Sequence, residues 1–267
     1  MAEISAKLVK ELRDQTGAGM MECKKALVET NGDLEAAKRL LREKGMAAAG
    51  KRAGRETTEG LVGYRVADDA SRGTLGAVGC ETEPVAKNDE FQAFARRVLD
   101  AVEEGGTEAT ASLEQERLEL SGKLGENVAV VGAARFEAVD GGRVSAYVHP
   151  PANKLGVLVG VRGADPELAR LLAMHISWTN PRWIGRDDVP EQAVTDEREI
   201  LSSTDEVKSK PEQAREKIVD GMLNKRFFGV FVLEDQEWIH DSSKKVGDVL
   251  REAGAEVLEF ERFALAG

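Results

Sequence analysis

The stretch from Leu12 to Leu27 reads L-R-D-Q-T-G-A-G-M-M-E-C-K-K-A-L, and it determines the fold expected around it. A short loop, Thr16-Gly17-Ala18-Gly19, leads directly into a helix that opens with Met20 and Met21. Consecutive side chains on a helix point in different directions, so one of the two methionines must point away from any single core stripe. The alternative is that both fill the core. The stretch predicts a helix–turn–helix with an apolar tip, framed by the positive charge of Lys24.

Apolar residues at helical spacing on both sides of this stretch predict a three-helix domain over residues 1–55. The helices are expected from about Glu3 to Asp14, from Met20 to about Asn31, and from an Asp33 cap to Gly45. The small, basic and glycine-bearing segment from Gly45 to Thr58 is interpreted as a linker or a loosely attached helix. Three such short helices bury little surface, so the domain is small and marginally stable alone.

The composition restricts the class of protein. The chain has 267 residues, of which 42% are hydrophobic and 32% charged, which suits a globular protein of two or more folded units. No run of about eighteen apolar residues is present to span a membrane, and the first residues lack a secretory apolar segment, so a cytoplasmic location is expected. The net charge of −11 disfavours RNA or DNA as a direct partner.

From Gly60 onward the hydrophobic period changes from helical to strand-like. Strands are expected at 61–66, 76–80, 128–136 and 143–148, with helices at 89–99 and 113–124. The strand sequence Leu75-Gly76-Ala77-Val78 is echoed by Leu155-Gly156-Val157-Leu158, and each copy precedes an amphipathic helix. This repeat predicts two similar α/β subdomains, one over 56–140 and one over 141–186 with 227–267.

Residues 187–226 are polar, with apolar positions at helical spacing, and they predict an antiparallel helical hairpin inserted in the second subdomain. A strand at 230–233, a helix at 246–253 and a strand at 256–265 are expected after it. The predicted fold class is therefore α+β, with a three-helix domain, a core of two α/β subdomains and an inserted coiled-coil-type hairpin.

Two motifs carry a resemblance to a known family. The Leu12–Leu27 stretch closely resembles the N-terminal signature of elongation factor Ts, the nucleotide exchange factor for elongation factor Tu. A second match, Cys80 to Phe91, reads C-E-T-E-P-V-A-K-N-D-E-F, where the family usually has T-D-F-V-A-K-N. Glu83 and Pro84 thus replace the usual aspartate and phenylalanine. Glu83 can take the acidic role, but Pro84 cannot act as an aromatic wedge.

The resemblance implies the function, the partner and the fold. The chain would bind elongation factor Tu in its GDP-bound and nucleotide-free states and promote GDP release. It also implies that the N-terminal domain is similar to ubiquitin-associated domains, and it leaves open a homodimer within a heterotetramer. The family's tip meets the GTPase domain of the partner, and the acidic–aromatic pair intrudes beside its magnesium site. The partner-binding residues implied are Arg13, Gly17, Met20, Met21, Lys24, Thr82, Glu83, Pro84, Val85, Lys87, Asn88 and His175.

Competing interpretations remain for these residues. Residues 82–88 can be an ordinary strand–helix connection, and His175 can be a core histidine. The chain can also be a helical adaptor that binds another protein through its first domain without exchange activity. An enzyme is not expected. Cys80 ends an apolar strand and Cys23 lies on a helix, where buried thiols are usually inert, and no third group that would orient His175 as a base is identifiable. Gly17-Ala18-Gly19 does not match a phosphate-binding loop, and no spacing suggests a metal site, so no cofactor is expected.

Overall fold

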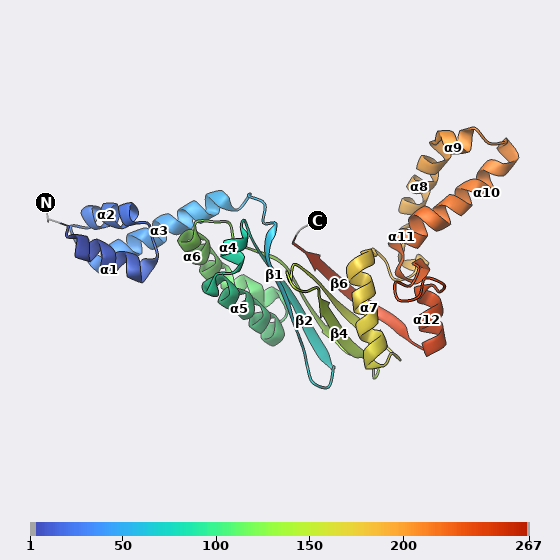
Figure 1. The fold of residues 1–267 in the computed structure, drawn as a ribbon, viewed down its shortest axis with the longest axis horizontal. Coiled ribbons are helices and arrows are strands. Elements are labelled where there is room, and N and C mark those ends of the chain that lie inside the picture. Colours follow the sequence, from blue (N-terminus) through green and yellow to red (C-terminus); the bar gives the residue numbers. More distant parts are fainter. Residues whose placement is uncertain (1–3, 266–267) are drawn as a thin grey trace.

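A computed structural model describes residues 4–265 of the chain. The molecule is elongated, with a three-helix unit at one end and a helical hairpin at the other (Figure 1). Two three-stranded antiparallel sheets lie between them, which confirms the predicted α+β class. No helix within residues 4–265 is both long enough and apolar enough to cross a membrane.

The three-helix unit consists of α1 (Ala6–Thr16), α2 (Met20–Glu29) and α3 (Leu34–Arg52). The Ser5 hydroxyl accepts a hydrogen bond from the Leu8 N–H and caps α1, while the predicted start at Glu3 lies outside the described residues. A small core holds the three helices together, and its fully buried members are Leu12, Cys23, Leu27 and Ala37.

Gly45 was expected to end the third helix, and this expectation is wrong. Helix α3 continues through Gly45 for two more turns to Arg52, because Gly45 packs closely against Gly122 of α6 (Glu114–Leu124). Glycine at this position allows two helix backbones to approach. The irregular linker is correspondingly short and covers only residues 53–58. A single helix therefore joins the three-helix unit to the rest of the molecule.

The six strands in residues 4–265 form two similar sheets. The first has the order β1 (Glu59–Val66), β2 (Arg72–Cys80), β3 (Ala129–Glu137). The second has the order β4 (Arg143–Val148), β5 (Leu155–Arg162), β6 (Glu256–Ala264). The echoed sequences occupy the central strands β2 and β5. Each central strand also shifts register against its third strand, at Ala77/Val78 and at Gly160/Val161.

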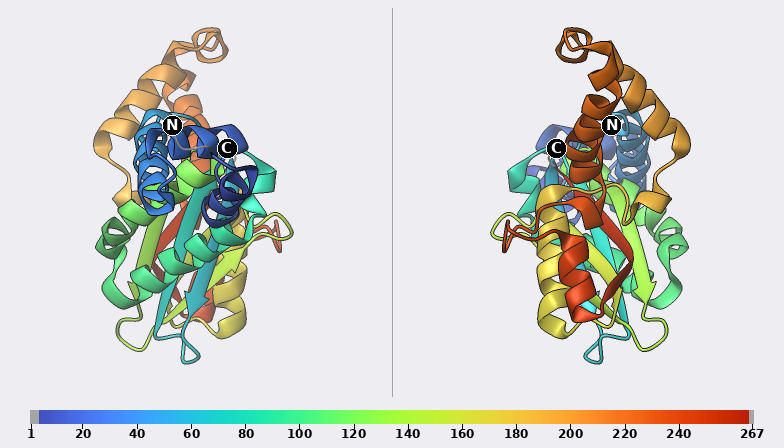
Figure 2. Two further views of the ribbon diagram at one scale, coloured as in Figure 1. Left: turned by 90° about the vertical axis from the view of Figure 1, so that its left-hand side faces the viewer. Right: turned by 90° about the vertical axis from the view of Figure 1, so that its right-hand side faces the viewer.

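The two sheets pack face to face, with helices on both outer sides. Leu75 and Ala77 of the first sheet meet Val144 and Leu158 of the second in a shared apolar layer. Helix α5 (Asp89–Gly105) covers the first sheet, followed by the 3₁₀ segment η1 (Thr107–Leu113) and α6. Helices α7 (Pro166–Thr179) and α12 (Val246–Ala253) cover the second, as the right-hand view of Figure 2 shows.

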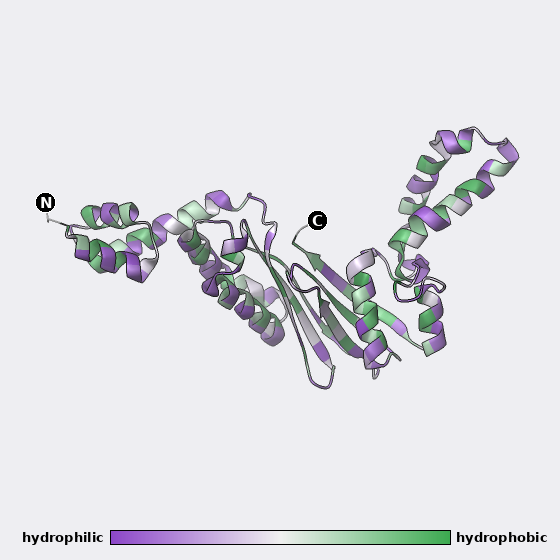
Figure 3. Ribbon diagram, viewed as in Figure 1, coloured by the Kyte–Doolittle hydropathy of each residue, from purple (hydrophilic) through white to green (hydrophobic). Residues whose placement is uncertain are grey.

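The inserted hairpin is formed by α8 (Glu191–Ser203), the short α9 (Asp205–Lys208) and α10 (Glu212–Met222), after a 3₁₀ turn, η2 (Arg186–Asp188). Its inner face is closed by Leu201, Val207 and Val219. Hydrophilic and hydrophobic residues alternate along both arms (Figure 3). This pattern is typical of helices that bury one stripe only.

A strand was expected at residues 230–233, and this prediction is also wrong. The chain continues from α10 as a π-helical turn, η3 (Leu223–Phe228), into α11 (Gly229–Phe231) and the 3₁₀ turn η4 (Leu233–Asp235). Only Val232 makes a strand-like bridge, to Trp183. Phe227 and Phe231 are four residues apart, and their ring centroids are 5.7 Å apart. This contact requires helical spacing, and therefore the aromatic cluster favours a helix over a strand.

Candidate functional site

The turn between α1 and α2 is held in one shape by local hydrogen bonds. Gly17 adopts a left-handed conformation with φ +70°, and its N–H donates to the Arg13 carbonyl at 2.7 Å. The Glu22 carboxylate accepts the Gly19 N–H at 3.3 Å, and the buried Cys23 thiol donates to the Ala18 carbonyl at 3.6 Å. The start of α2 is therefore positioned without help from a partner.

The two methionines at this turn lie on the surface. Met20 is 46% exposed and Met21 is 65% exposed, which excludes the core-filling interpretation. Val28, two turns further along α2, is 52% exposed and was missed in the sequence reasoning. Its signal was the spacing of Met20, Lys24 and Val28 at i, i+4 and i+8. We call the surface formed by Met20, Met21, Lys24 and Val28 the apolar tip.

Residues 82–88 were expected to form a loop, but they contain a one-turn helix, α4 (Glu83–Ala86). The Ala86 N–H donates to the Thr82 carbonyl at 3.1 Å, and the Lys87 N–H donates to the Glu83 carbonyl at 3.0 Å. Ala86 is buried while Glu83 and Pro84 are exposed. Proline is tolerated here because the first turn of a helix needs no N–H donor. The segment presents Glu83 and Pro84 outward on an anchored turn.

The charge of Glu83 is stabilised by its neighbour on the same turn. Lys87 Nζ lies 2.7 Å from Glu83 Oε1. This hydrogen-bonded ion pair lowers the pKa of Glu83 and raises the pKa of Lys87. Both side chains are exposed, so salt screens the attraction. Asn88 caps the next helix instead, because its Oδ1 accepts the N–H of Glu90 at 2.9 Å.

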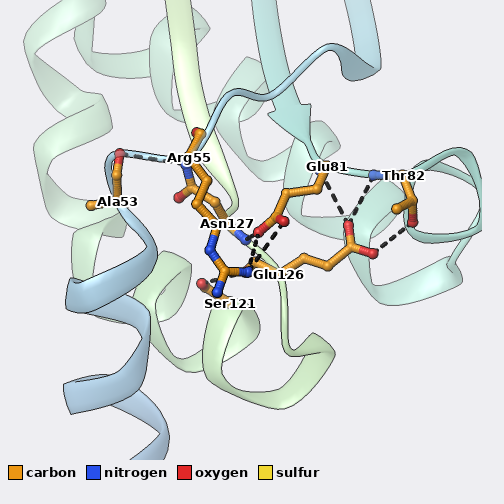
Figure 4. Close-up of polar contacts among 7 residues, drawn as sticks. All are labelled: Ala53, Arg55, Glu81, Thr82, Ser121, Glu126 and Asn127. Carbon is orange, nitrogen blue, oxygen red and sulfur yellow. Dashed lines mark hydrogen bonds and ion pairs between the residues drawn. The ribbon is translucent and has the colours of Figure 1, made fainter.

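A polar network fixes the chain that leads into α4 (Figure 4). The Glu126 carboxylate, in the turn between α6 and β3, accepts the backbone N–H groups of Glu81 and Thr82 at 3.1 and 3.0 Å. The Glu81 carboxylate in turn accepts the Asn127 N–H at 2.6 Å and contacts Arg55 at 3.3 Å. The Asn127 bond and the Arg55 guanidinium lower the pKa of Glu81. We call this reciprocal arrangement the Glu81–Glu126 clasp.

The structure brings the apolar tip and the α4 segment into one half of the molecule, away from the hairpin (Figure 1). The connection runs through Lys123 of α6. Its side chain lies against Gly17, where an added Cβ would come within 2.8 Å of Lys123 Cε. The Lys123 ammonium binds Glu90 at 2.7 Å, next to Asn88 at the end of the segment. Arg13, Gly17, Lys24, Thr82 and Lys87 are exposed, and Val85 and Asn88 are half-buried.

His175 lies elsewhere, on α7 beside the second sheet, and its side chain is fully buried. Its Nε2 is 2.9 Å from Gln236 Oε1, its Nδ1 is 3.4 Å from the Ile239 N–H, and its ring stacks on Trp238 at 5.1 Å. Burial lowers the pKa of His175 to about 4. A direct contact with a partner therefore requires another residue of this helix. Trp178, one turn further, is 78% exposed, and the sequence reasoning missed it.

Both cysteines lie in apolar cores. Cys80 is fully buried in the core of the first sheet, and burial raises the pKa of its thiol to about 12. Cys23 is fully buried in the core of the three-helix unit. His175 packs in the core behind the second sheet, so neither thiol is paired with it as a nucleophile with its base. The exposed groups of the candidate site suit contact with a macromolecule.

Comparisons with known proteins identify the family of the chain. The family model described as "Elongation factor TS" matches residues 81–267. The elongation factor Ts of Thioalkalivibrio sulfidiphilus is 42% identical over 97% of this chain and 91% of its own length. Those of Cronobacter sakazakii and Escherichia coli O139:H28 are each 40% identical over 98% of this chain and 92% of their own lengths. The chain therefore belongs to the elongation factor Ts family, a family of translation elongation factors.

Proposed function

We propose that this protein is a guanine nucleotide exchange factor for elongation factor Tu. It binds the GDP-loaded partner in the cytoplasm, speeds the release of GDP and holds the nucleotide-free partner. No covalent bond is made or broken, so the protein is not an enzyme in the chemical sense. Family membership supports this proposal, together with the exposed surfaces of the apolar tip and the α4 segment.

The observation that carries the proposal is the contact chain from the turn just before the apolar tip to the α4 segment. Gly17 contacts Lys123, Lys123 pairs with Glu90, and Glu90 adjoins the end of the α4 segment. A single surface of a partner can thus meet both elements. The tip offers apolar area and a positive charge at Lys24, and α4 offers the carboxylate of Glu83. A bare adaptor needs only the tip.

Exchange requires differential affinity. The factor must bind the nucleotide-free partner more tightly than the GDP-bound one. By linkage, bound GDP lowers the partner's affinity for the factor by the same ratio by which the bound factor lowers the partner's affinity for GDP. Magnesium at a nucleotide site demands near-ideal octahedral geometry, so a small displacement of its surroundings weakens it. In our proposal the tip grips the GTPase domain, and Glu83 presses beside its magnesium and phosphate site.

The remaining surfaces supply binding free energy for that distortion. We assign the role of holding the other domains of the partner to the second subdomain (141–186 with 227–267) and to the hairpin (187–226). The exposed Trp178 of α7 belongs to this second surface. The first subdomain (56–140) carries α4, and the N-terminal domain (1–55) carries the tip. A homodimer within a heterotetramer is compatible with this division.

The decisive experiment uses the cognate elongation factor Tu loaded with fluorescent GDP. Catalytic amounts of the protein should accelerate loss of the fluorescent nucleotide in the presence of excess unlabelled GDP. An unchanged release rate at saturating protein would refute exchange activity. Binding to elongation factor Tu without faster release would instead favour the adaptor interpretation, and binding should be measured in the same titration by calorimetry.

A further inference from the structure

The chain just before α4 depends on one carboxylate from another part of the molecule. Glu126 Oε2 accepts the N–H groups of Glu81 and Thr82, and Glu126 Oε1 accepts the Thr82 hydroxyl at 2.6 Å. Strand β2 ends at Cys80, so these two N–H groups have no partner in the sheet. Thr82 is the N-cap residue of α4, yet its side chain makes no capping bond to its own helix. The start of α4 is thus held from outside.

Glu126 is itself fixed in place. The Ser121 hydroxyl donates to the Glu126 carbonyl at 2.5 Å, at the end of α6. The following residue, Asn127, is only 3% exposed, and its backbone N–H donates to Glu81. Its side-chain amide donates to the Arg55 carbonyl at 2.8 Å. The Glu81–Glu126 clasp therefore joins the linker after α3, the start of α4 and the turn between α6 and β3 (Figure 4).

From this geometry we propose that Glu126 is a positioning residue for nucleotide exchange, acting through Thr82 and Glu81 on α4. The inference rests on the proposed function. If α4 displaces groups at the nucleotide site of the partner, the same contact tends to displace α4. A four-residue helix has little rigidity of its own, so the three hydrogen bonds to Glu126 resist that displacement.

The inference separates release rate from affinity. The apolar tip and the second surface lie outside the clasp, and they contribute affinity whether or not α4 is held. Loss of the hydrogen bonds to Glu126 removes a restraint on α4 that contributes when the nucleotide site is distorted, and therefore affects the release step. We therefore expect Glu126→Ala to lower the GDP release rate at saturating factor about tenfold, which corresponds to roughly one charge-assisted hydrogen bond. The half-saturating concentration should change less than about threefold.

The experiment compares the parent with Glu126→Ala, Glu126→Gln and a matched control, Glu116→Gln. Glu116 lies on α6 and pairs only with Arg97 in the described structure, on the surface. Glu126→Gln keeps an acceptor oxygen but loses the charge, so its release rate should fall between those of Glu126→Ala and Glu116→Gln. Glu116→Gln should match the parent. Equal saturating rates for the parent and Glu126→Ala would overturn the inference, whereas an inactive parent would refute exchange itself.

A second readout does not depend on activity. Amide hydrogen exchange of the free protein should accelerate at residues 81–88 in Glu126→Ala, with α5 and the centre of β2 as protected as in the parent. Unchanged protection at 81–88 would contradict the inference.

Thr82→Val tests the same contact from its other side, because it removes only the hydroxyl. In a double-mutant cycle, Thr82→Val added to Glu126→Ala should lower the saturating release rate by less than twofold further. Fully additive losses would show that the two residues act independently, and the inference would fail. If Glu126→Ala proves too unstable, Thr82→Val alone still tests the contact, because its saturating release rate should fall below that of the parent, and an unchanged rate would count against the inference.

Discussion

Gly45 of α3 and Gly122 of α6 face each other at the point where the two helices cross. A Cβ placed on Gly122 would lie 2.7 Å from the Gly45 carbonyl carbon, which is closer than side-chain carbons approach a backbone. The crossing is supported at its rim by the ion pair of Arg42 on α3 with Glu119 on α6. The three-helix unit is therefore attached to the core through a tight glycine contact near the candidate site.

Gly122→Val should loosen this attachment. The added side chain forces α3 and α6 apart, and overpacking of this kind typically costs about 1–3 kcal/mol. Because the sheets are not involved, the loss should appear as faster proteolysis within residues 53–58 and faster hydrogen exchange along α3. Gly50→Val is the matched control, since a Cβ at Gly50 meets no atom within 4 Å. Equal protection of α3 in both variants would show that the close approach is unimportant.

Met20→Asp combined with Met21→Asp should weaken binding to elongation factor Tu by about 30-fold or more, because it places charge in an apolar contact. The fold should survive, since the two side chains are 46% and 65% exposed. Calorimetric affinity and thermal unfolding of the same sample check both statements. Val139→Asp is the control, because Val139 is 55% exposed between β3 and β4. Unaltered affinity with a collapsed melting temperature would place the methionines in the core.

Pro84→Phe should raise the rate of GDP release more than it raises affinity for the nucleotide-free partner. Phenylalanine restores the aromatic side chain usual in the family and offers far more contact area than proline. No native hydrogen bond is lost, because position 84 lies in the first turn of α4. Stopped-flow release beside equilibrium binding measures the two effects. A folded variant with an unchanged or lower release rate would show that exchange in this protein needs no aromatic wedge.

His175 should make stability depend on mildly acidic pH. Its pKa falls from 6.5 to about 4 through burial, opposed in part by the Gln236 hydrogen bond. Between these values the unfolded chain binds a proton that the folded chain does not. The contribution is therefore complete above pH 6.5 and is lost as the pH falls toward 4, by up to about 3 kcal/mol. Denaturant unfolding of the parent and His175→Gln at several pH values separates the contribution of His175 to the free energy of unfolding from the contributions of the carboxylates. Parallel pH profiles for the two proteins would contradict it.

Local sequence signals predicted most of the elements. The helical spacing of apolar residues around the Leu12–Leu27 stretch, the Asp33 cap and the echoed strand sequences are short-range features, and the corresponding helices and strands form as expected. The exposure of one of the two methionines was also readable, because adjacent helical positions cannot share one buried stripe, whereas the exposure of both was seen only in the structure. The α+β class and the family followed from these patterns and from the two motifs.

The errors arose where a residue's partner is distant in sequence. Gly45 looked like a helix stop because its partner, Gly122, is 77 positions away, and close backbone packing leaves no local signal. Residues 230–233 looked like a strand by composition, but the ring of Phe227 packs against Trp183, 44 positions earlier, and the chain is helical as far as Phe231. Tertiary context overrides local propensity at such places.

The sequence by itself thus determined the family, the main helices and strands, and the apolar and acidic character of the two motifs. Only the tertiary structure decided that His175 is buried, that α4 is a helical turn, and that Glu126 holds it. No local sequence pattern predicts that the Glu126 carboxylate accepts these hydrogen bonds. Its donors lie 44 and 45 residues away, and they come close to it only when the sheets have formed.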